Sequence, residues 1–336
     1  TESGRLQSAD VVWDAEKKVW LHLYPDQDLK GDDGLHWTGP YKTWNSRCAE
    51  CHATGYDKNY DPKTGHYAST QAEIGVGCEA CHGPGEAHVQ ANQSPIRRYL
   101  SHLGGSADDT TIAQPALLDP QRSSQVCGQC HSVWEFYGPE DERVANADGF
   151  PYRPGDELTD TRFVAQPRQN LDTPTMRDFV AQDPEFIRGS FWADGMIRVS
   201  GREYNGLIDS PCFRDAADPE ETLSCFSCHT MHKTADDPRS IETWADTHQI
   251  GAKRDSNEAC TQCHAAIASD VSAHTNHSLD STGSSCYNCH MPYTSYGLLK
   301  AIRSHTISSP SVAETVEVGR PNACNLCHLD QTLAWT

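Results

Sequence analysis

One five-residue pattern recurs through this 336-residue sequence and constrains its fold more than any other feature. The pattern is Cys-x-x-Cys-His, and its seven copies begin at positions 48, 78, 127, 225, 260, 286 and 324. With 15 Cys and 17 His in the chain, random placement would produce roughly 0.03 copies. Seven copies therefore indicate a chemistry that needs two thiols three positions apart and a histidine directly after the second.

Covalent haem attachment explains every position of this pattern. Each thiol forms a thioether with one haem vinyl group, and the adjacent imidazole binds the iron as the proximal ligand. A zinc site can use Cys-x-x-Cys pairs, but it does not require a histidine after each pair. A thioredoxin-type dithiol needs one motif in a βαβ context, and disulfides leave the histidines unexplained. We therefore expect seven covalently bound c-type haems.

The motifs define the predicted attachment cysteines and proximal ligands. The attachment cysteines are Cys48, Cys51, Cys78, Cys81, Cys127, Cys130, Cys225, Cys228, Cys260, Cys263, Cys286, Cys289, Cys324 and Cys327. The proximal ligands are His52, His82, His131, His229, His264, His290 and His328. Cys212 lies outside the motifs, and three roles stay open for it: a free buried thiol, a thiolate ligand or an intermolecular disulfide.

Composition indicates a core built from cofactor more than from side chains. Hydrophobic residues make up 37% of the chain, and the mean hydropathy is −0.66. A typical globular chain is about 45–50% apolar when glycine is included. The 24 Gly and 19 Pro residues favour turns and loops. We expect a mostly α and irregular fold with little β structure, in which a closely packed haem array forms the core.

The formal net charge is −20 at pH 7. This charge would repel nucleic acid and anionic membrane surfaces, and it suits docking to a basic redox protein. The sequence has no apolar run of about 18 residues, so it predicts no transmembrane helix. Haem is attached covalently on the outer side of the cytoplasmic membrane. Residues 1–10 are polar, with no visible signal peptide, so we expect a mature periplasmic or extracellular protein.

Ten histidines lie outside the motifs, more than the seven irons need as sixth ligands. Mostly bis-histidine, low-potential haems are therefore expected. Met231 and Met291, close to proximal histidines, are interpreted as packing residues. His66, in a turn-like segment, is the weakest candidate. The predicted distal ligands are His22, His36, His88, His232, His248, His274, His277 and His305.

Two of these assignments carry spatial expectations. His232 lies three residues after His229, so it should bind a different iron. His274 and His277 would share one face of a helix over 257–277, which leaves one of them as a candidate surplus residue.

Motif spacing divides the sequence into three regions. The gap of 98 residues between the third and fourth motifs is the longest by far. It separates a three-haem region (1–131), a His-free insert (132–224) and a four-haem region (225–336). The insert has nine Arg and no Lys.

Local patterns predict secondary structure in a few places. Residues 11–23 read as a hairpin that puts His22 on a strand. Thr173 before Pro174 predicts a capped helix start. Residues 115–125 and 304–311 read as connecting loops.

Longer stretches resemble a group of exported bacterial multihaem cytochromes c, related to the tetrahaem cytochrome that accepts electrons from hydroxylamine oxidoreductase. One such stretch is Cys-His-Gly-Pro-Gly-Glu-Ala-His at 81–88. The others are residues 35–38, 44–54, 73–80, 194–204, 289–292 and 320–330. The resemblance implies bis-histidine electron-transfer haems in a close array outside the cytoplasm. It favours His22, His36, His88, His232, His277 and His305 as distal ligands, and it implies a further tail after Thr336.

Two functions follow as expectations. The first is an electron carrier between a redox donor and a redox acceptor. Copies of the chain stacked end to end could continue the series of haems as a filament. The alternative is an oxidoreductase acting on nitrite, hydroxylamine or a sulfur oxyanion at one haem with an open iron site. Residues of the insert could form a substrate pocket at such a haem. They are Tyr152, Arg153, Arg162, Arg168, Arg198, Arg202 and Tyr204. The opposing interpretation is that these arginines pair with haem propionates or with acidic side chains instead.

Overall fold

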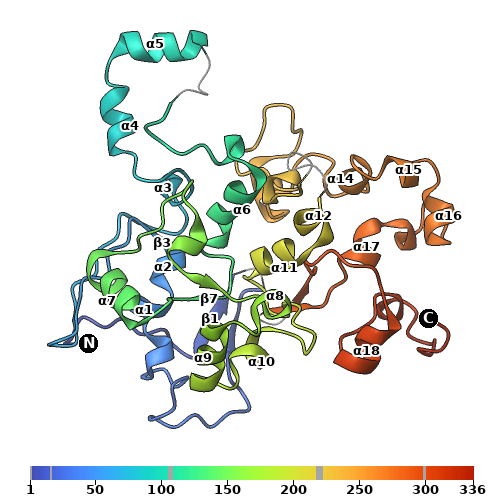
Figure 1. Cartoon of the computed structure of the whole chain (residues 1–336), viewed down its shortest axis with the longest axis horizontal. Coiled ribbons are helices and arrows are strands. Elements are labelled where there is room, and N and C mark those ends of the chain that lie inside the picture. The colour runs from blue at the N-terminus through green and yellow to red at the C-terminus, as the bar shows by residue number, and fades with distance from the viewer. Residues whose placement is uncertain (1, 16, 105–108, 217–221, 298–299) are drawn as a thin grey trace. The chain divides into compact units, whose positions relative to one another are not determined.

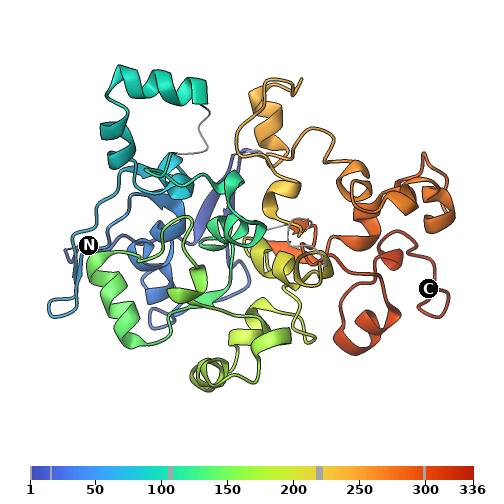
Figure 2. The same cartoon turned by 45° about the horizontal axis from the view of Figure 1, so that its top comes forward.

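Short helices joined by loops make up most of the chain, as Figures 1 and 2 show. The computed structural model describes residues 2–15, 17–104, 109–216, 222–297 and 300–336. In this part of the chain the longest α-helices have 10 residues, and every sheet has two strands. The predicted fold class, mostly helical and irregular with little β structure, is confirmed.

The chain divides into two units. The N-terminal unit comprises Thr1–Ala113 and Gly138–Pro154, and the C-terminal unit comprises Gln114–Tyr137 and Gly155–Thr336. The first two Cys-x-x-Cys-His motifs lie in the N-terminal unit, and the other five lie in the C-terminal unit. The third motif thus shares a unit with the four that follow it. The three-region division by motif spacing stays a prediction.

The helices of both units are short, and proline opens several of them. Proline is the first residue of α5, α6, α7, α8, α9 and α12, where its fixed φ suits a helix start and no N–H is needed. The α-helices of the N-terminal unit are α1 (Trp44–Arg47), α2 (Ala49–His52), α3 (Cys78–His82), α4 (Glu86–Ala91), α5 (Pro95–Gly104) and α7 (Pro139–Asp148). Those of the C-terminal unit are α6 (Pro120–Gly128), α8 (Pro167–Asn170), α9 (Pro174–Gln182), α10 (Phe186–Ser190), α11 (Glu203–Asp209), α12 (Pro211–Arg214), α13 (Ile241–Asp246), α14 (Glu258–Thr261), α15 (Ala265–Ala268), α16 (Val271–Thr275), α17 (Cys286–His290) and α18 (Val312–Val318).

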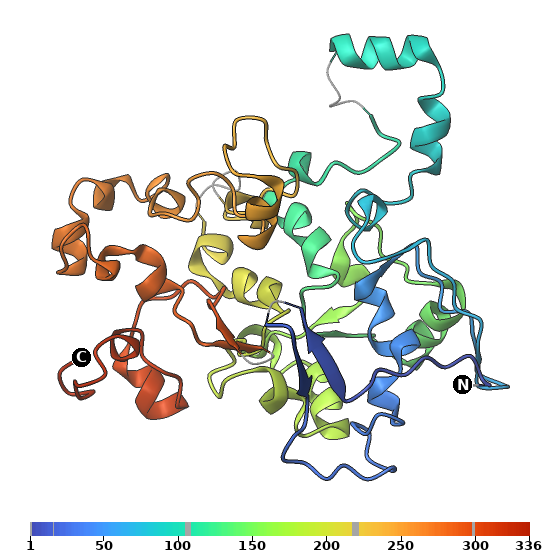
Figure 3. The same cartoon turned by 180° about the vertical axis from the view of Figure 1, so that it is seen from behind.

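The strands form antiparallel pairs. In the N-terminal unit these are β1 (Val11–Asp14) with β2 (Val19–His22), β3 (Ala53–Thr54) with β6 (Glu73–Ile74), and β4 (Tyr60–Asp61) with β5 (His66–Tyr67). In the C-terminal unit they are β7 (Trp134–Glu135) with β8 (Phe163–Val164), and β9 (Ser295–Gly297) with β10 (Lys300–Ile302). The β1–β2 pair, seen from behind in Figure 3, confirms the predicted hairpin and puts His22 at the end of a strand.

Two further local predictions are confirmed. The Thr173 hydroxyl accepts the peptide N–H of Met176, so it caps α9 as the Thr-Pro sequence indicates. Residues 304–311 contain neither helix nor strand, as expected for a connecting loop.

Two local predictions are wrong. Residues 115–125 are not a loop, because Asp119 caps α6 by accepting the N–H groups of Gln121 and Arg122. The predicted helix over 257–277 is broken into α14, α15 and α16. Asp270 caps a new start there, so its side chain competes with helix continuation.

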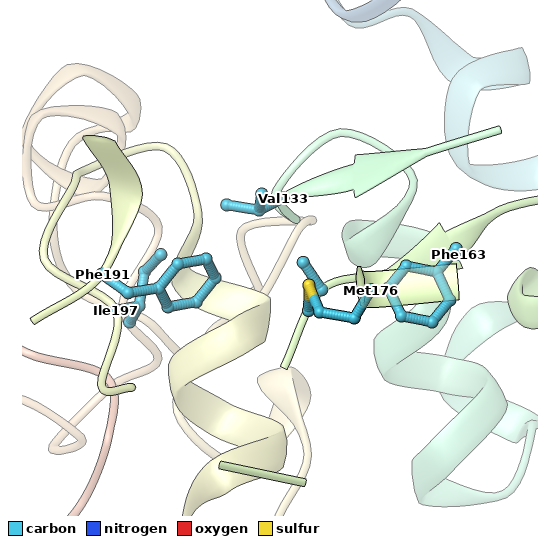
Figure 4. Close-up of a cluster of buried hydrophobic side chains, with 6 residues drawn as sticks. Val133, Phe163, Met176, Phe191 and Ile197 are labelled. Atoms are coloured by element: carbon cyan, nitrogen blue, oxygen red, sulfur yellow. The ribbon is translucent and has the colours of Figure 1, made fainter. Parts of the chain in front are cut away.

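A conventional apolar core lies in the part of the C-terminal unit that lacks histidine. Figure 4 shows this cluster, which combines strand β8, helix α9 and the loop after α10. Partly buried aromatic rings pack around it, including Phe179, whose ring centroid lies 5.6 Å from that of Phe163. The insert therefore builds side-chain packing where it has no attachment motif. The cluster consists of Val133, Phe163, Ala165, Met176, Phe191 and Ile197.

Truncating the centre of this cluster should destabilise the C-terminal unit. Met176 has 0% exposure, so Met176→Ala leaves a cavity and should lower the free energy of unfolding by about 2–5 kcal/mol. Denaturant unfolding followed by tryptophan fluorescence measures this change. Val316→Ala, at a side chain that is 69% exposed, is the control and should change stability by less than about 0.5 kcal/mol. Equal losses for the two variants would contradict the assignment of this core.

Candidate haem-binding sites

Each Cys-x-x-Cys-His motif folds into one helical turn. In five motifs the histidine N–H donates to the carbonyl of the first cysteine at 2.9–3.0 Å. The second and sixth motifs are the helices α3 and α17 themselves. Residues three and four positions apart share a helix face, so each turn presents two thiols and an imidazole on one side. All 15 cysteines lie in the described part of the chain, and none forms a disulfide.

Three proximal histidines face a second histidine across a gap that fits one iron atom. Two imidazoles bound in line to one metal, each at about 2 Å, have ring centroids roughly 6 Å apart. The angles between the ring planes are 16°, 11° and 35°. The residues present therefore fit a macrocycle held between two axial imidazoles. The pairs are His229 with His305 at 6.5 Å, His290 with His274 at 6.2 Å, and His328 with His277 at 6.1 Å.

Hydrogen bonds at Nδ1 leave the other ring nitrogen available for a metal. Nδ1 of His229 lies 2.9 Å from the carbonyl of His248, and Nδ1 of His305 lies 3.2 Å from that of Arg303. Burial lowers the pKa of both His229 and His305, which keeps their imidazoles neutral. A neutral imidazole that donates from Nδ1 has its lone pair on Nε2. The other two pairs have the same contact at one ring each, between His290 and Ser308 at 2.9 Å and between His277 and Thr275 at 2.6 Å.

Cysteine contacts link the third, fourth and fifth motifs. The thiols of Cys127 and Cys225 are hydrogen-bonded, and this bond raises the pKa of Cys127, with burial adding to the effect, and lowers the pKa of Cys225. Cys228 of the fourth motif interacts electrostatically with Cys260 of the fifth. These motifs are up to 98 positions apart in sequence, so only the fold brings them together.

The same kind of contact continues to the seventh motif. Burial and the neighbouring Cys286 raise the pKa of Cys260 to about 12, which places the fifth motif beside the sixth. Burial and Cys324 raise the pKa of Cys289, which places the sixth motif beside the seventh. The five motifs of the C-terminal unit therefore lie close together, and Tyr287 of the sixth motif is also hydrogen-bonded to Cys228 of the fourth.

The proximal histidine of the third motif has a carboxylate partner. Nδ1 of His131 lies 2.7 Å from Oε2 of Glu203, and Oε1 of Glu203 accepts the Gly201 N–H at 2.7 Å. Burial alone would raise the pKa of Glu203, but the hydrogen bond and charge of His131 hold that pKa at about 2. The hydrogen bond to Glu203 raises the pKa of His131. The carboxylate is thus ionised against the imidazole.

In the N-terminal unit, two histidines have Nδ1 contacts that suit metal binding through Nε2. Nδ1 of His82 lies 2.7 Å from the carbonyl of Ala113, and Nδ1 of His88 lies 3.0 Å from Oδ2 of Asp109. Hydrogen bonds from Thr111 lower the pKa of Asp109 to about 2. His88 is therefore held as the distal-ligand prediction requires, and its distal role stays a prediction.

His22 and His36 are held differently. Nδ1 of His22 accepts the Tyr24 N–H at 3.1 Å, and Nδ1 of His36 accepts the Thr38 N–H at 3.2 Å. A neutral ring with this contact carries its proton on Nε2. Binding an iron through Nε2 would therefore require these contacts to change. Their distal roles stay predictions.

The other predicted residues are four histidines outside the motifs and Cys212. His248 has a left-handed φ of 57° and contributes its backbone carbonyl to His229. The distal roles of His248 and His232 stay predictions. Both His274 and His277 lie close to a proximal ring, and the distal role of each stays a prediction. Burial raises the pKa of Cys212, which favours the neutral thiol among its three open roles.

The residues predicted to line a substrate pocket are divided between the two units, and several of their side chains contact other side chains of this chain. Tyr152 and Arg153 belong to the N-terminal unit, and the other five belong to the C-terminal unit. Arg168 forms ion pairs with Asp194 and Asp209. These contacts agree with the opposing interpretation that the arginines pair with acidic side chains. Two other arginines stack on rings, Arg162 over Trp134 at 4.1 Å and Arg198 over Trp192 at 5.3 Å.

Two families of known cytochromes match parts of the chain. Residues 23–83, which contain the first two motifs, match the family described as cytochrome c554 and c-prime. Residues 244–329, which contain the last three motifs, match the family of cytochrome c7 and related cytochrome c. The chain is a multihaem cytochrome c. Covalently bound haem c is therefore its cofactor, and the helical turns described above are the predicted attachment sites.

Individual relatives of this multihaem cytochrome are distant. It is 24% identical over 189 residues to cytochrome c nitrite reductase subunit NrfA of Nitratidesulfovibrio vulgaris, and 21% identical over 264 residues to multiheme cytochrome MtrA of Shewanella baltica. These matches cover 56% and 79% of the chain but only 32% and 45% of the relatives. The chain therefore spans less than half the length of either relative.

A solved structure shows the same fold. The outer cell wall cytochrome OcwA superposes with a TM-score of 0.53 at 19% identity, over 97% of this chain and 66% of that one. Helical and irregular architecture with small sheets is thus common to both. In the described residues of this cytochrome, no helix is long and apolar enough to cross a bilayer.

The site contains partners that sequence reasoning missed. Glu203 and Asp109 contact histidines 72 and 21 positions away, and nothing in their local sequence marks them. The carbonyls of Ala113, His248 and Ser308 carry no side-chain signal at all. Only the tertiary structure could identify these groups.

Proposed function

We propose that this cytochrome is a heptahaem protein that transfers electrons between a redox donor protein and a redox acceptor protein. Each of its seven Cys-x-x-Cys-His turns would hold one covalent haem. The observation that carries the proposal is the proximity of cysteines from different motifs of the C-terminal unit, with hydrogen bonds joining Cys127 to Cys225 and Cys260 to Cys286. This proximity favours closely spaced redox sites over isolated ones.

The chain's own residues suit this role. When bound, haem c supplies a reversible one-electron iron couple. The opposed imidazoles of the three pairs would fill both axial positions, which leaves no position for a substrate at those sites. Hydrogen bonds from Nδ1 to backbone carbonyls fix the ring orientation. Rigid ligands of this kind support transfer without rearrangement.

Export and an acidic docking surface complete the proposal. Covalent haem attachment takes place outside the cytoplasm, and OcwA, which shares the fold, is an outer cell wall cytochrome. We place this chain in the periplasm or outside the cell. Its net charge of −20 suits a basic partner and disfavours nucleic acid. Assembly of copies through stacked haems stays a prediction, which sedimentation over a range of concentrations tests.

The alternative is a reductase with one open haem. The similarity to a nitrite reductase subunit makes nitrite the first substrate to test. However, the arginines offered for its pocket contact carboxylates and aromatic rings. Electron transfer is therefore the function that the geometry supports best.

Haem count and spin state together test the proposal. Intact mass of the denatured holoprotein should exceed the polypeptide mass by seven haems. Electron paramagnetic resonance should show low-spin signals from the imidazole pairs, and the protein should not turn over nitrite, hydroxylamine or sulfite. A haem number other than seven would contradict the heptahaem assignment. A high-spin haem together with substrate turnover would support the reductase instead.

A further inference from the structure

We propose that Glu203 lowers the reduction potential at the third motif and makes it the lowest-potential site of the C-terminal unit. Glu203 acts through His131, so it is a positioning and tuning residue without contact to the iron. The inference rests on the proposed function, because it assumes a haem attached at Cys127 and Cys130. It goes beyond that function because it assigns to the Glu203 carboxylate a lowering of the reduction potential of the third haem alone.

The contact is built by the start of helix α11. Oε2 of Glu203 lies 2.7 Å from Nδ1 of His131, while Oε1 is fixed by the Gly201 N–H. The next residue, Tyr204, donates its N–H to the His131 carbonyl at 3.0 Å. Consecutive residues of one helix therefore hold both the ring and the backbone of the same histidine. The Glu203 side chain is 23% exposed, so water screens its charge only in part.

Two other proximal histidines of the C-terminal unit have a described Nδ1 partner, and in both cases it is a backbone carbonyl. Nδ1 of His229 and Nδ1 of His290 each lie 2.9 Å from that carbonyl oxygen. A carbonyl is a neutral acceptor, whereas Glu203 carries a full negative charge. The third motif therefore differs from these two by one charge at the same ring position.

The negative charge of Glu203 should lower the reduction potential of the haem at the third motif. A carboxylate on Nδ1–H raises the basicity of the imidazole as a metal ligand. A more basic axial ligand, with a negative charge close by, stabilises the oxidised iron relative to the reduced iron and lowers the potential. Arg202 is a cation that interacts electrostatically with His131, and its guanidinium donates to the carbonyls of Gly201 and Cys130 at 2.7 and 3.2 Å. Its charge opposes that of Glu203 without forming the hydrogen bond to His131.

Glu203→Gln tests the inference with little change of shape. The amide oxygen can still accept hydrogen bonds, but the negative charge is gone. In a spectroelectrochemical titration of the holoprotein, the lowest step of the C-terminal unit should move to higher potential, while the other steps keep theirs. Resonance Raman spectra should show a weaker iron–histidine bond for one haem. Glu203→Asp retains the charge, so its lowest step should stay below that of Glu203→Gln.

Asp209→Asn is the matched control, because it removes another carboxylate from the same helix. Asp209 contacts Gln169 and Arg168 and, among the residues that the structure describes, no histidine, so its titration curve should overlay that of the wild type. The inference fails if Glu203→Gln also overlays the wild type, or if the two variants shift equally. Mass spectrometry separates this failure from failure of the proposed function. If the haem at Cys127 and Cys130 is absent from the wild type, the proposed function is wrong; if it is present and unshifted, only the role of Glu203 is wrong.

Discussion

Replacing both Cys225 and Cys228 by alanine should remove one haem and destabilise the C-terminal unit by more than a core mutation does. Intact mass should fall by one haem beyond the loss of two sulfur atoms. Cys225 is hydrogen-bonded to Cys127 of the third motif, and Cys228 interacts electrostatically with Cys260 of the fifth, so loss of the fourth haem would remove a neighbour of both motifs. We expect the unfolding free energy to fall by more than the roughly 3–5 kcal/mol typical of an aromatic-to-alanine change. Mass spectrometry and thermal unfolding at the haem absorbance measure both effects.

Cys212→Ser is the matched control for this prediction. Cys212 lies in the same unit and is half-buried, but it belongs to no attachment motif. Its replacement should leave the haem number unchanged and alter stability far less. If Cys212→Ser also lost a haem, the assignment of attachment by motif would be wrong. If the double variant kept all its haems, thioether attachment at the fourth motif would be excluded.

His305→Ala should create one additional high-spin haem relative to the wild type. The ring of His305 faces that of His229 at 6.5 Å, and its Nδ1 is held by the Arg303 carbonyl. Removing it opens one axial position at the fourth motif, while the other pairs stay intact. Electron paramagnetic resonance at low temperature should show a new high-spin signal equivalent to one haem. His305→Met restores a sixth ligand of weaker donor strength, so the same haem should return to low spin at a higher potential.

His66→Ala serves as the control for the spin-state change. His66 lies in strand β5 opposite Asp61, in a short hairpin of the N-terminal unit. Its loss should leave the high-spin content unchanged. An unchanged spectrum for His305→Ala would mean that His305 is not the distal ligand of the fourth haem. The alternative ligand would then be sought among His232 and His248.

Much of this cytochrome follows from local sequence. A Cys-x-x-Cys-His run predicts both the attachment cysteines and the proximal ligand by itself, because one helical turn of about four residues brings all three side chains to one face. Hairpin and helix-start signals are equally local, and those at 11–23 and at Thr173 are confirmed. The two wrong local predictions also have local causes. Asp119 and Asp270 are cap residues whose side chains start new helices within patterns that read as a loop and as one continuous helix.

What the sequence could not determine is which groups meet across long separations. Ten histidines were available as distal ligands, and their spacing could not select the partners that the fold places opposite His229, His290 and His328. The approach of Cys127 to Cys225 and of Glu203 to His131 likewise joins residues 98 and 72 positions apart. Covalent haem attachment depends on residues within one helical turn, so the motif alone predicts it. Axial pairing, spacing and electrostatic tuning depend on the closure of long loops, so only the tertiary structure decides them.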